Sequence, residues 1–312
     1  MDGEKPALLK FQHPDITAKG EARATVPFAR LETLWVNTGT LCNVECTHCY
    51  IESSPANDRL SYLTARELEP FLDEAKTMGA REIGFTGGEP FMNPEMIAMT
   101  EAALSRGFET LILTNAMKPM MRPRVRDGLL KLREDYGARL TLRVSLDHYS
   151  QDGHDAERGA SAFALGLEGL KWLQNNGFDV TVAGRTLSGE DEETLRKGFA
   201  ALFAENGIYI DARDKNQLVI FPEMDAVKDL PEITTACWSI LGKDPNDIMC
   251  ATSRMVVKRK GAAGPAVLSC TLLPYDAQFE MGRSLEEASS PVKLNHPFCA
   301  QFCVLGGASC SG

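Results

Sequence analysis

Three cysteines lie within eight residues near the start of the chain, at Cys42, Cys46 and Cys49. Their thiolates could bind a metal centre, and the segment contains no fourth cysteine. In a [4Fe-4S] cube each iron normally takes one thiolate, so a cube held by three cysteines leaves one iron open to an outside ligand. A zinc site and ordinary buried thiols are the alternatives. The spacing therefore indicates an iron–sulfur site that can take part in chemistry.

A glycine-rich run, Thr-Gly-Gly-Glu-Pro at 86–90, follows some 40 residues later at the end of an apolar segment. By itself such a run indicates only a turn that ends a strand. Together with the Cys-x3-Cys-x2-Cys spacing, however, it resembles the radical S-adenosylmethionine (SAM) superfamily. In that family the open iron binds the methionine part of SAM, and an electron from the cluster releases a 5'-deoxyadenosyl radical that takes a hydrogen atom from the substrate.

The resemblance also implies which residues bind SAM. The segment Gly87, Gly88 and Glu89 would hold the amino group of the methionine, with glycine allowing close approach of the backbone. Ser145 and Asp147 are candidates for the ribose and the carboxylate. The other candidates are Asn115, which follows a strand, and the two arginines that could pair the carboxylate, Arg158 and Arg185. Structural roles at the rim of a barrel are the alternative for Ser145, Asp147 and the arginines.

Six further cysteines lie in the last 76 residues. Thirteen residues separate Cys250 from Gly264, and five more separate Gly264 from Cys270. This spacing resembles the opening of SPASM and twitch domains, except that it has one more residue after the glycine. In those domains the opening is a β-hairpin with two ligands of an auxiliary [4Fe-4S] cluster. Six thiolates are too few for two complete extra cubes, so we expect one. Its ligands would be Cys250, Cys270, Cys299 and either Cys303 or Cys310, with Cys237 left for packing or for facing the substrate.

The elements that position these residues alternate between strand and helix. We expect helices at 64–79, 93–107, 121–136, 160–176 and 190–205, the first opened by the capping box of Thr64 and Glu67 and the second capped by Asn93-Pro94. Six strands alternate with them, which implies a parallel sheet. The strands are expected at Leu34–Asn37, Glu82–Thr86, Glu109–Thr114, Arg139–Ser145, Asp179–Arg185 and Gln217–Phe221.

The strand at 139–145 alternates most clearly, with leucine and valine on one face and Thr141, Arg143 and Ser145 on the other. We expect the apolar face to meet outer helices and the polar face to look into a barrel that encloses a ligand. The predicted fold is α/β, a partial (β/α)6 TIM-like barrel with a small C-terminal cysteine-rich domain of SPASM or twitch type. The expected parts are an N-terminal extension at 1–30, the barrel at 31–225 and the auxiliary-cluster domain at 226–312.

Composition limits the possible partners. The net charge of −10 argues against a nucleic-acid surface, which needs clustered Lys and Arg. The N-terminus has no signal-peptide pattern, and nowhere do 18 apolar residues run together, so we expect no membrane segment and a cytoplasmic location. Nine cysteines in such a compartment indicate metal ligands or catalytic thiols. The resemblance also implies an external electron donor such as flavodoxin or ferredoxin.

A cluster beside the substrate could accept an electron, so we expect a net oxidation, either dehydrogenation or formation of a cross-link. A base would then take a proton, and the candidates are Tyr275 and Asp276, with Glu223 and Asp225 as further choices. We expect a small metabolite as substrate because few residues precede the first strand; modification of a peptide or protein side chain is the alternative. Other classes stay open: a non-catalytic electron-transfer protein, and an interaction module whose tail cysteines bind zinc.

Overall fold

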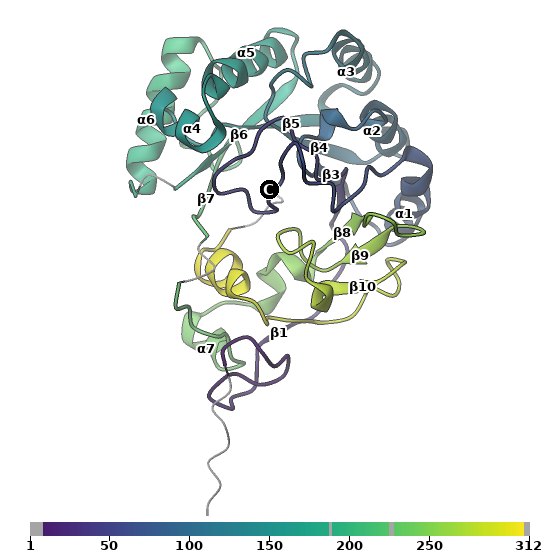
Figure 1. The fold of residues 1–312 in the computed structure, drawn as a ribbon, viewed down its shortest axis with the longest axis vertical. Helices are drawn as coiled ribbons and strands as arrows, with labels where there is room; N and C mark the ends of the chain where they lie inside the picture. Colours follow the sequence, from purple (N-terminus) through teal and green to yellow (C-terminus); the bar gives the residue numbers. More distant parts are fainter. Residues whose placement is uncertain (1–8, 187–188, 225–227, 309–312) are drawn as a thin grey trace, which may run out of the picture.

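The computed structural model describes residues 9–186, 189–224 and 228–308. Its centre is a nine-stranded sheet in the order β10-β9-β8-β2-β3-β4-β5-β6-β7. Strands β2 to β7 pair in parallel, and the helices between them cover the outer side of the curved sheet (Figure 1). The six strands expected from the sequence are confirmed to within one residue: β2 (Thr33–Asn37), β3 (Glu82–Thr86), β4 (Glu109–Thr114), β5 (Leu140–Ser145), β6 (Asp179–Arg185) and β7 (Leu218–Phe221).

The two faces of the sheet have different neighbours. The leucines and the valine of β5 belong to an outer apolar core shared with the helices. The inward side chains of other strands, such as Trp35 of β2 and Leu111 of β4, belong to a second core that includes Phe302 from the tail. The alternation predicted for β5 is therefore confirmed, and Ser145 on its inner face lines a pocket. Part of the barrel interior is closed by apolar side chains of the tail.

The outer helices follow the expected pattern, with one difference in capping. The structure confirms the capping box of Thr64 and Glu67. The second helix begins later than expected, at Met96, with Glu95 at the cap position. Asn93 Oδ1 accepts from the backbone N–H of Glu95 (2.9 Å) in the turn before the helix, and the Asn93 amide donates to the carbonyl oxygens of Thr38 (3.0 Å) and Leu63 (2.8 Å). Asn93 therefore ties together two distant loops. The helices are α1 (Ala65–Thr77), α2 (Met96–Ser105), α3 (Pro123–Tyr136), α5 (Ala162–Asn175), α6 (Glu192–Asn206) and a short α4 (Gln151–Arg158) that was not expected.

The tail is joined to the barrel through its hairpin. Strands β8 (Ser253–Val257) and β9 (Ala266–Leu268) pair antiparallel, as expected, and β8 also pairs in parallel with β2. The sheet continues to β10 (Glu280–Gly282), while β1 (Thr25–Val26) pairs with β11 (Val292–Lys293). The rest of the tail includes α7 (Cys237–Leu241) and a π-helical segment, Cys299–Leu305. The predicted segments 1–30 and 226–312 are thus tied to each other, and the hairpin shares a sheet with the barrel.

Among the helices of the described ranges, none combines the length and the apolar content that crossing a membrane requires.

Candidate active site

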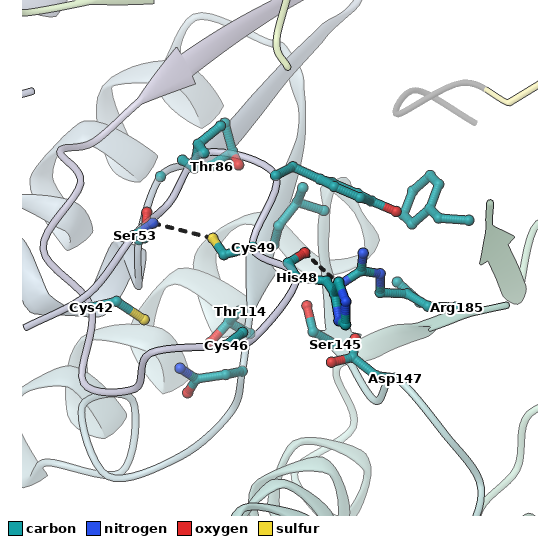
Figure 2. A pocket seen from close by; sticks show the side chains of 18 of the residues that line it. Cys42, Cys46, His48, Cys49, Ser53, Thr86, Thr114, Ser145, Asp147 and Arg185 are labelled. Atoms are coloured by element: carbon teal, nitrogen blue, oxygen red, sulfur yellow. Dashed lines mark hydrogen bonds between the residues drawn. The ribbon is translucent and has the colours of Figure 1, made fainter. Parts of the chain in front are cut away.

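The carboxyl ends of β2 to β7 surround one pocket, shown in Figure 2. Each of these strands contributes to its lining, from Trp35 of β2 to Phe221 of β7. The early cysteine loop closes one side of the pocket, and the tail contributes Thr271 and Leu272. The structure brings most of the expected cofactor residues to this lining: Cys42, Cys46, Cys49, Gly87, Gly88, Asn115, Ser145, Asp147, Arg158 and Arg185.

The three loop cysteines lie together at one side of the pocket. Burial raises the pKa of Cys42 to about 12 and also raises the pKa of Cys46, so both are neutral thiols in this structure and would ionise only beside a positive centre such as a bound metal. The backbone N–H of Ser53 already points at the sulfur of Cys49, at 3.2 Å. Hydrogen bonds of this kind tune iron–sulfur centres. These are also the only cysteines in the described lining of the pocket, so the donor set fits a cube held by three thiolates.

The cysteine loop is held in place by the end of α4. The backbone N–H of Thr47 donates to the carbonyl oxygen of Glu157 at 2.9 Å, and His48 Nδ1 lies 2.8 Å from the Glu157 carboxylate. Sequence analysis missed this helix, although Ser150, whose hydroxyl accepts from the Gly153 N–H, is a typical cap. His48 also lines the pocket, with its ring held by Glu157.

The two glycines of the motif are required by contacts within the protein. A Cβ atom at Gly88 would lie 2.2 Å from the carbonyl oxygen of Leu41, and one at Gly87 would lie 2.5 Å from that of Gly39. Gly87 also has a φ of +142°, which L side chains rarely adopt. The glycines therefore let the end of β3 press against the chain that leads into the cysteine loop. We had expected glycine here for close approach to a ligand.

Glu89 is buried behind this turn and does not appear in the described lining of the pocket. Its carboxylate accepts hydrogen bonds from the backbone N–H groups of Asn115 (2.8 Å) and Phe91 (3.2 Å) and from the hydroxyl of Thr114 (2.9 Å). Burial outweighs these bonds and raises the pKa of Glu89 to about 7. In the structure Glu89 fixes the end of β4 against β3, and its contact with SAM stays a prediction.

The two candidate arginines have different partners. Arg158 forms a bidentate ion pair with Asp147, with distances of 2.7 Å from Nε to Oδ2 and 3.0 Å from Nη2 to Oδ1. Burial raises the pKa of Asp147, but Arg158 outweighs that effect and holds it below its usual range. Arg185 donates from Nη1 to the His48 carbonyl, while its buried Nε and Nη2 have no partner in the described residues. Binding of an anionic group by Arg185 stays a prediction.

A second cavity collects the cysteines of the tail. Cys250, Cys270, Cys299 and Cys303 all line it, and two of its other lining residues, Thr271 and Leu272, also line the first pocket. Burial raises the pKa of Cys250 to about 12 and that of Cys299 well above its usual value. In the described residues no three His, Cys, Asp or Glu side chains lie close enough to hold a single metal ion. These four residues could hold an auxiliary cluster, and the zinc alternative requires metal analysis.

The remaining tail candidates lie elsewhere. Cys310 and Asp225 fall outside the described residues. Cys237 lines neither cavity, and its sulfur accepts from the Thr234 N–H at 3.4 Å, which fits a packing role. Of the remaining base candidates, Asp276 accepts from the Gln278 N–H in a 3-10 turn beside a separate polar cavity. A role for it as a base stays a prediction.

Tyr275, the other predicted base, has partners for its hydroxyl. It donates to the carbonyl oxygen of Ile51 at 2.7 Å and accepts from the side-chain amide of Asn57 at 3.2 Å. The guanidinium of Arg59 lies 3.5 Å from the centroid of the Tyr275 ring. These contacts anchor the segment that follows Cys49, and Tyr275 is not in the described lining of the active-site pocket. Its catalytic role stays a prediction.

A parallel barrel with three thiols at its mouth and a tight glycine turn beside them is the arrangement that the resemblance implied for an iron–sulfur enzyme that uses SAM. The model of the radical SAM superfamily matches residues 36–198, just over half of the chain. The chain therefore belongs to the radical SAM superfamily, whose members use a [4Fe-4S] cluster, SAM and a source of electrons. A cube held by the three loop cysteines would supply the electron that cleaves SAM.

The similar proteins include a bacteriocin biosynthesis protein and a heme synthase. The bacteriocin subtilosin biosynthesis protein AlbA of Bacillus subtilis is 29% identical over 143 residues, 46% of this chain and 30% of AlbA. The AdoMet-dependent heme synthase of Methanosarcina barkeri is 29% identical over 162 residues, 51% of this chain and 43% of that protein. The matches thus span less than half of these relatives. Streptococcus suis SuiB has a similar fold, with a TM-score of 0.60 at 15% identity, covering 81% of this chain and 63% of SuiB.

Proposed function

We propose that this enzyme oxidises a side chain of a peptide or protein. Sequence analysis favoured a small metabolite, but the comparisons support the peptide alternative. AlbA takes part in bacteriocin biosynthesis, and SuiB has been crystallised with its precursor peptide SuiA. The heme synthase supports the second candidate, oxidation of a small molecule.

One observation carries the proposal: the pocket at the cysteine loop meets the cavity of the tail cysteines at Thr271 and Leu272. A substrate in the pocket therefore lies next to both cysteine sites. The lining of the pocket includes the large apolar side chains Trp35, Leu113 and Phe221. These side chains suit contact with a hydrocarbon or aromatic group of a peptide substrate.

The proposed reaction is a net two-electron oxidation. The substrate gives a hydrogen atom to the 5'-deoxyadenosyl radical, and then loses one proton and one electron. An auxiliary cube at Cys250, Cys270, Cys299 and Cys303 would supply the acceptor for that electron. We place the enzyme in the cytoplasm, with flavodoxin or ferredoxin as the electron donor, because reduced iron–sulfur centres and free thiols require a reducing compartment.

The first test is cleavage of SAM by the reduced, reconstituted chain under anaerobic conditions. Wild type should form 5'-deoxyadenosine, and the triple variant C42A/C46A/C49A should form none above a protein-free control, because the cluster ligands are gone. Cys237→Ala is the matched control, since Cys237 lies in neither cavity, and should keep wild-type activity. Formation of 5'-deoxyadenosine by the triple variant would exclude this loop as the cluster site.

The second test separates the two substrate classes. A cell extract is divided by size into a peptide fraction and a small-molecule fraction, and each is incubated with wild type and with the triple variant. A mass loss of about two units that requires wild type and appears on a peptide supports the proposal. The same loss confined to the small-molecule fraction supports the second candidate. A gain of about fourteen units would indicate methylation and contradict the oxidative proposal.

A further inference from the structure

Arg254, in β8, is buried without a carboxylate partner. Arg254 is 1% exposed, and it forms no ion pair with an Asp or Glu side chain in the described residues. Its guanidinium instead donates to four backbone carbonyl oxygens: Ala288 (2.7 Å), Cys250 (2.7 Å), Ser253 (2.7 Å) and Ser290 (3.2 Å). The ring of Phe28 covers it, with its centroid 4.3 Å from Cζ.

Two arginines with little exposure have a carboxylate partner, whereas Arg185, like Arg254, donates to the backbone and forms no ion pair with Asp or Glu in the described residues. Arg23 pairs with Glu232 at 2.6 Å, and Arg158 pairs with Asp147. A buried cation without an anion costs several kcal/mol, which carbonyl dipoles and an aromatic face only partly offset. The guanidinium stays protonated in proteins. A negative centre near Arg254 would complete the pair.

The position of such a centre follows from the hydrogen bonds. Arg254 Nη1 donates to the carbonyl oxygen of Cys250 at 2.7 Å, so the guanidinium lies directly beside this residue of the tail. Cys250 lines the tail cavity with three other cysteines. We propose that Arg254 is the charge-compensating residue of the auxiliary cluster and raises its reduction potential. This inference rests on the proposed cluster at the tail cysteines.

The direction of the effect follows from charge. A [4Fe-4S] cube with four thiolates is negative, and reduction adds one more negative charge, so a nearby fixed cation favours the reduced form. A higher potential makes the cluster a better acceptor for the electron that the substrate loses. Arg254 thus favours oxidation of the substrate radical without touching the substrate.

The test is a potentiometric titration of the tail cluster, followed by electron paramagnetic resonance, in the full chain carrying C42A/C46A/C49A. Arg254→Gln and Arg254→Met remove the charge and should lower the equilibrium constant for reduction at least tenfold, which is about 59 mV for one electron. Arg254→Lys keeps the charge and should stay within threefold of the parent. Arg259→Met is the matched control, because Arg259 lies on the same hairpin and is already paired with Glu280 at 2.8 Å.

Each outcome decides the proposal. An unchanged potential in loaded Arg254→Gln overturns it. Neutral variants that fold but hold less iron than Arg254→Lys support it, because the charge then retains the cluster. If Arg254→Lys fails to fold or shifts as far as the neutral variants, hydrogen-bond geometry and not charge is the role of Arg254, and the proposal is wrong. Absence of iron from the parent itself would refute the auxiliary cluster and leave the SAM-cleavage test unaffected.

Discussion

The buried ion pair of Asp147 and Arg158 should make a large contribution to stability. Its side chains are 2% and 12% exposed, and its shorter contact is 2.7 Å. At that separation an effective dielectric constant near 20 gives an attraction of roughly 6 kcal/mol, part of which only offsets desolvation. In Arg158→Met the Asp147 carboxylate would remain buried without its cation. We expect that variant to lose about 3–5 kcal/mol of unfolding free energy.

The assay is anaerobic urea unfolding at pH 7 of Arg158→Met, Asp147→Asn and the double variant. The double variant should be more stable than Arg158→Met, because it contains no unpaired buried charge. Lys197→Met is the matched control, since its pair with Glu193 is exposed on the surface, and it should change stability by less than about 0.5 kcal/mol. A loss below about 1 kcal/mol in Arg158→Met, the level of a surface pair, would refute the reasoning.

Three further predictions concern the same site. Because burial raises the pKa of Glu89 from 4.5 to about 7, unfolding free energy should fall by about 3 kcal/mol as the pH rises through that window. Urea unfolding at a series of pH values measures this dependence, and Glu89→Gln should flatten the plot of unfolding free energy against pH. An equal slope in wild type and Glu89→Gln would contradict the raised pKa of Glu89. Tyr275→Phe loses the hydrogen bond to the Ile51 carbonyl in the segment that follows Cys49, and this variant should release iron to a chelator several-fold faster. Tyr209→Phe is the control because Tyr209 is exposed. Equal rates of iron release in the two variants would exclude an anchoring role for Tyr275. Gly88→Ala should prevent loading of the loop cluster, measured as iron per chain, whereas Gly264→Ala, with open space around it, should load normally.

The auxiliary cluster gives a separate prediction. Cys250→Ala and Cys270→Ala should each lower iron from about eight to about four per chain and leave SAM cleavage without substrate largely intact, because the two clusters have different ligands. Cys237→Ala again serves as the control and should keep all the iron. Unchanged iron in both tail variants, or zinc in its place, would contradict an iron–sulfur cluster at these cysteines.

The sequence by itself determined the features that depend on neighbouring residues. Alternation along 139–145 fixed which face of β5 meets the helices, since a strand has a period of two. The capping box of Thr64 and Glu67 likewise involves residues three apart. The spacing of the three loop cysteines predicted a three-thiol site, because a short loop brings all of them to one place. These local patterns were sufficient to predict the barrel fold and the resemblance to the radical SAM superfamily.

The tertiary structure decided the features that join distant parts of the chain. Pairing of β8 with β2 links residues more than 200 positions apart, and no local pattern encodes it. Gly88 is glycine because of the Leu41 carbonyl, and only the fold shows that Arg158 is paired with Asp147 while Arg185 keeps two N–H groups without a partner in the described residues. Arg254 has no sequence signal of its own, because only folding shows that it is buried without a carboxylate beside Cys250. Such roles depend on which side chains meet, and that is set by packing.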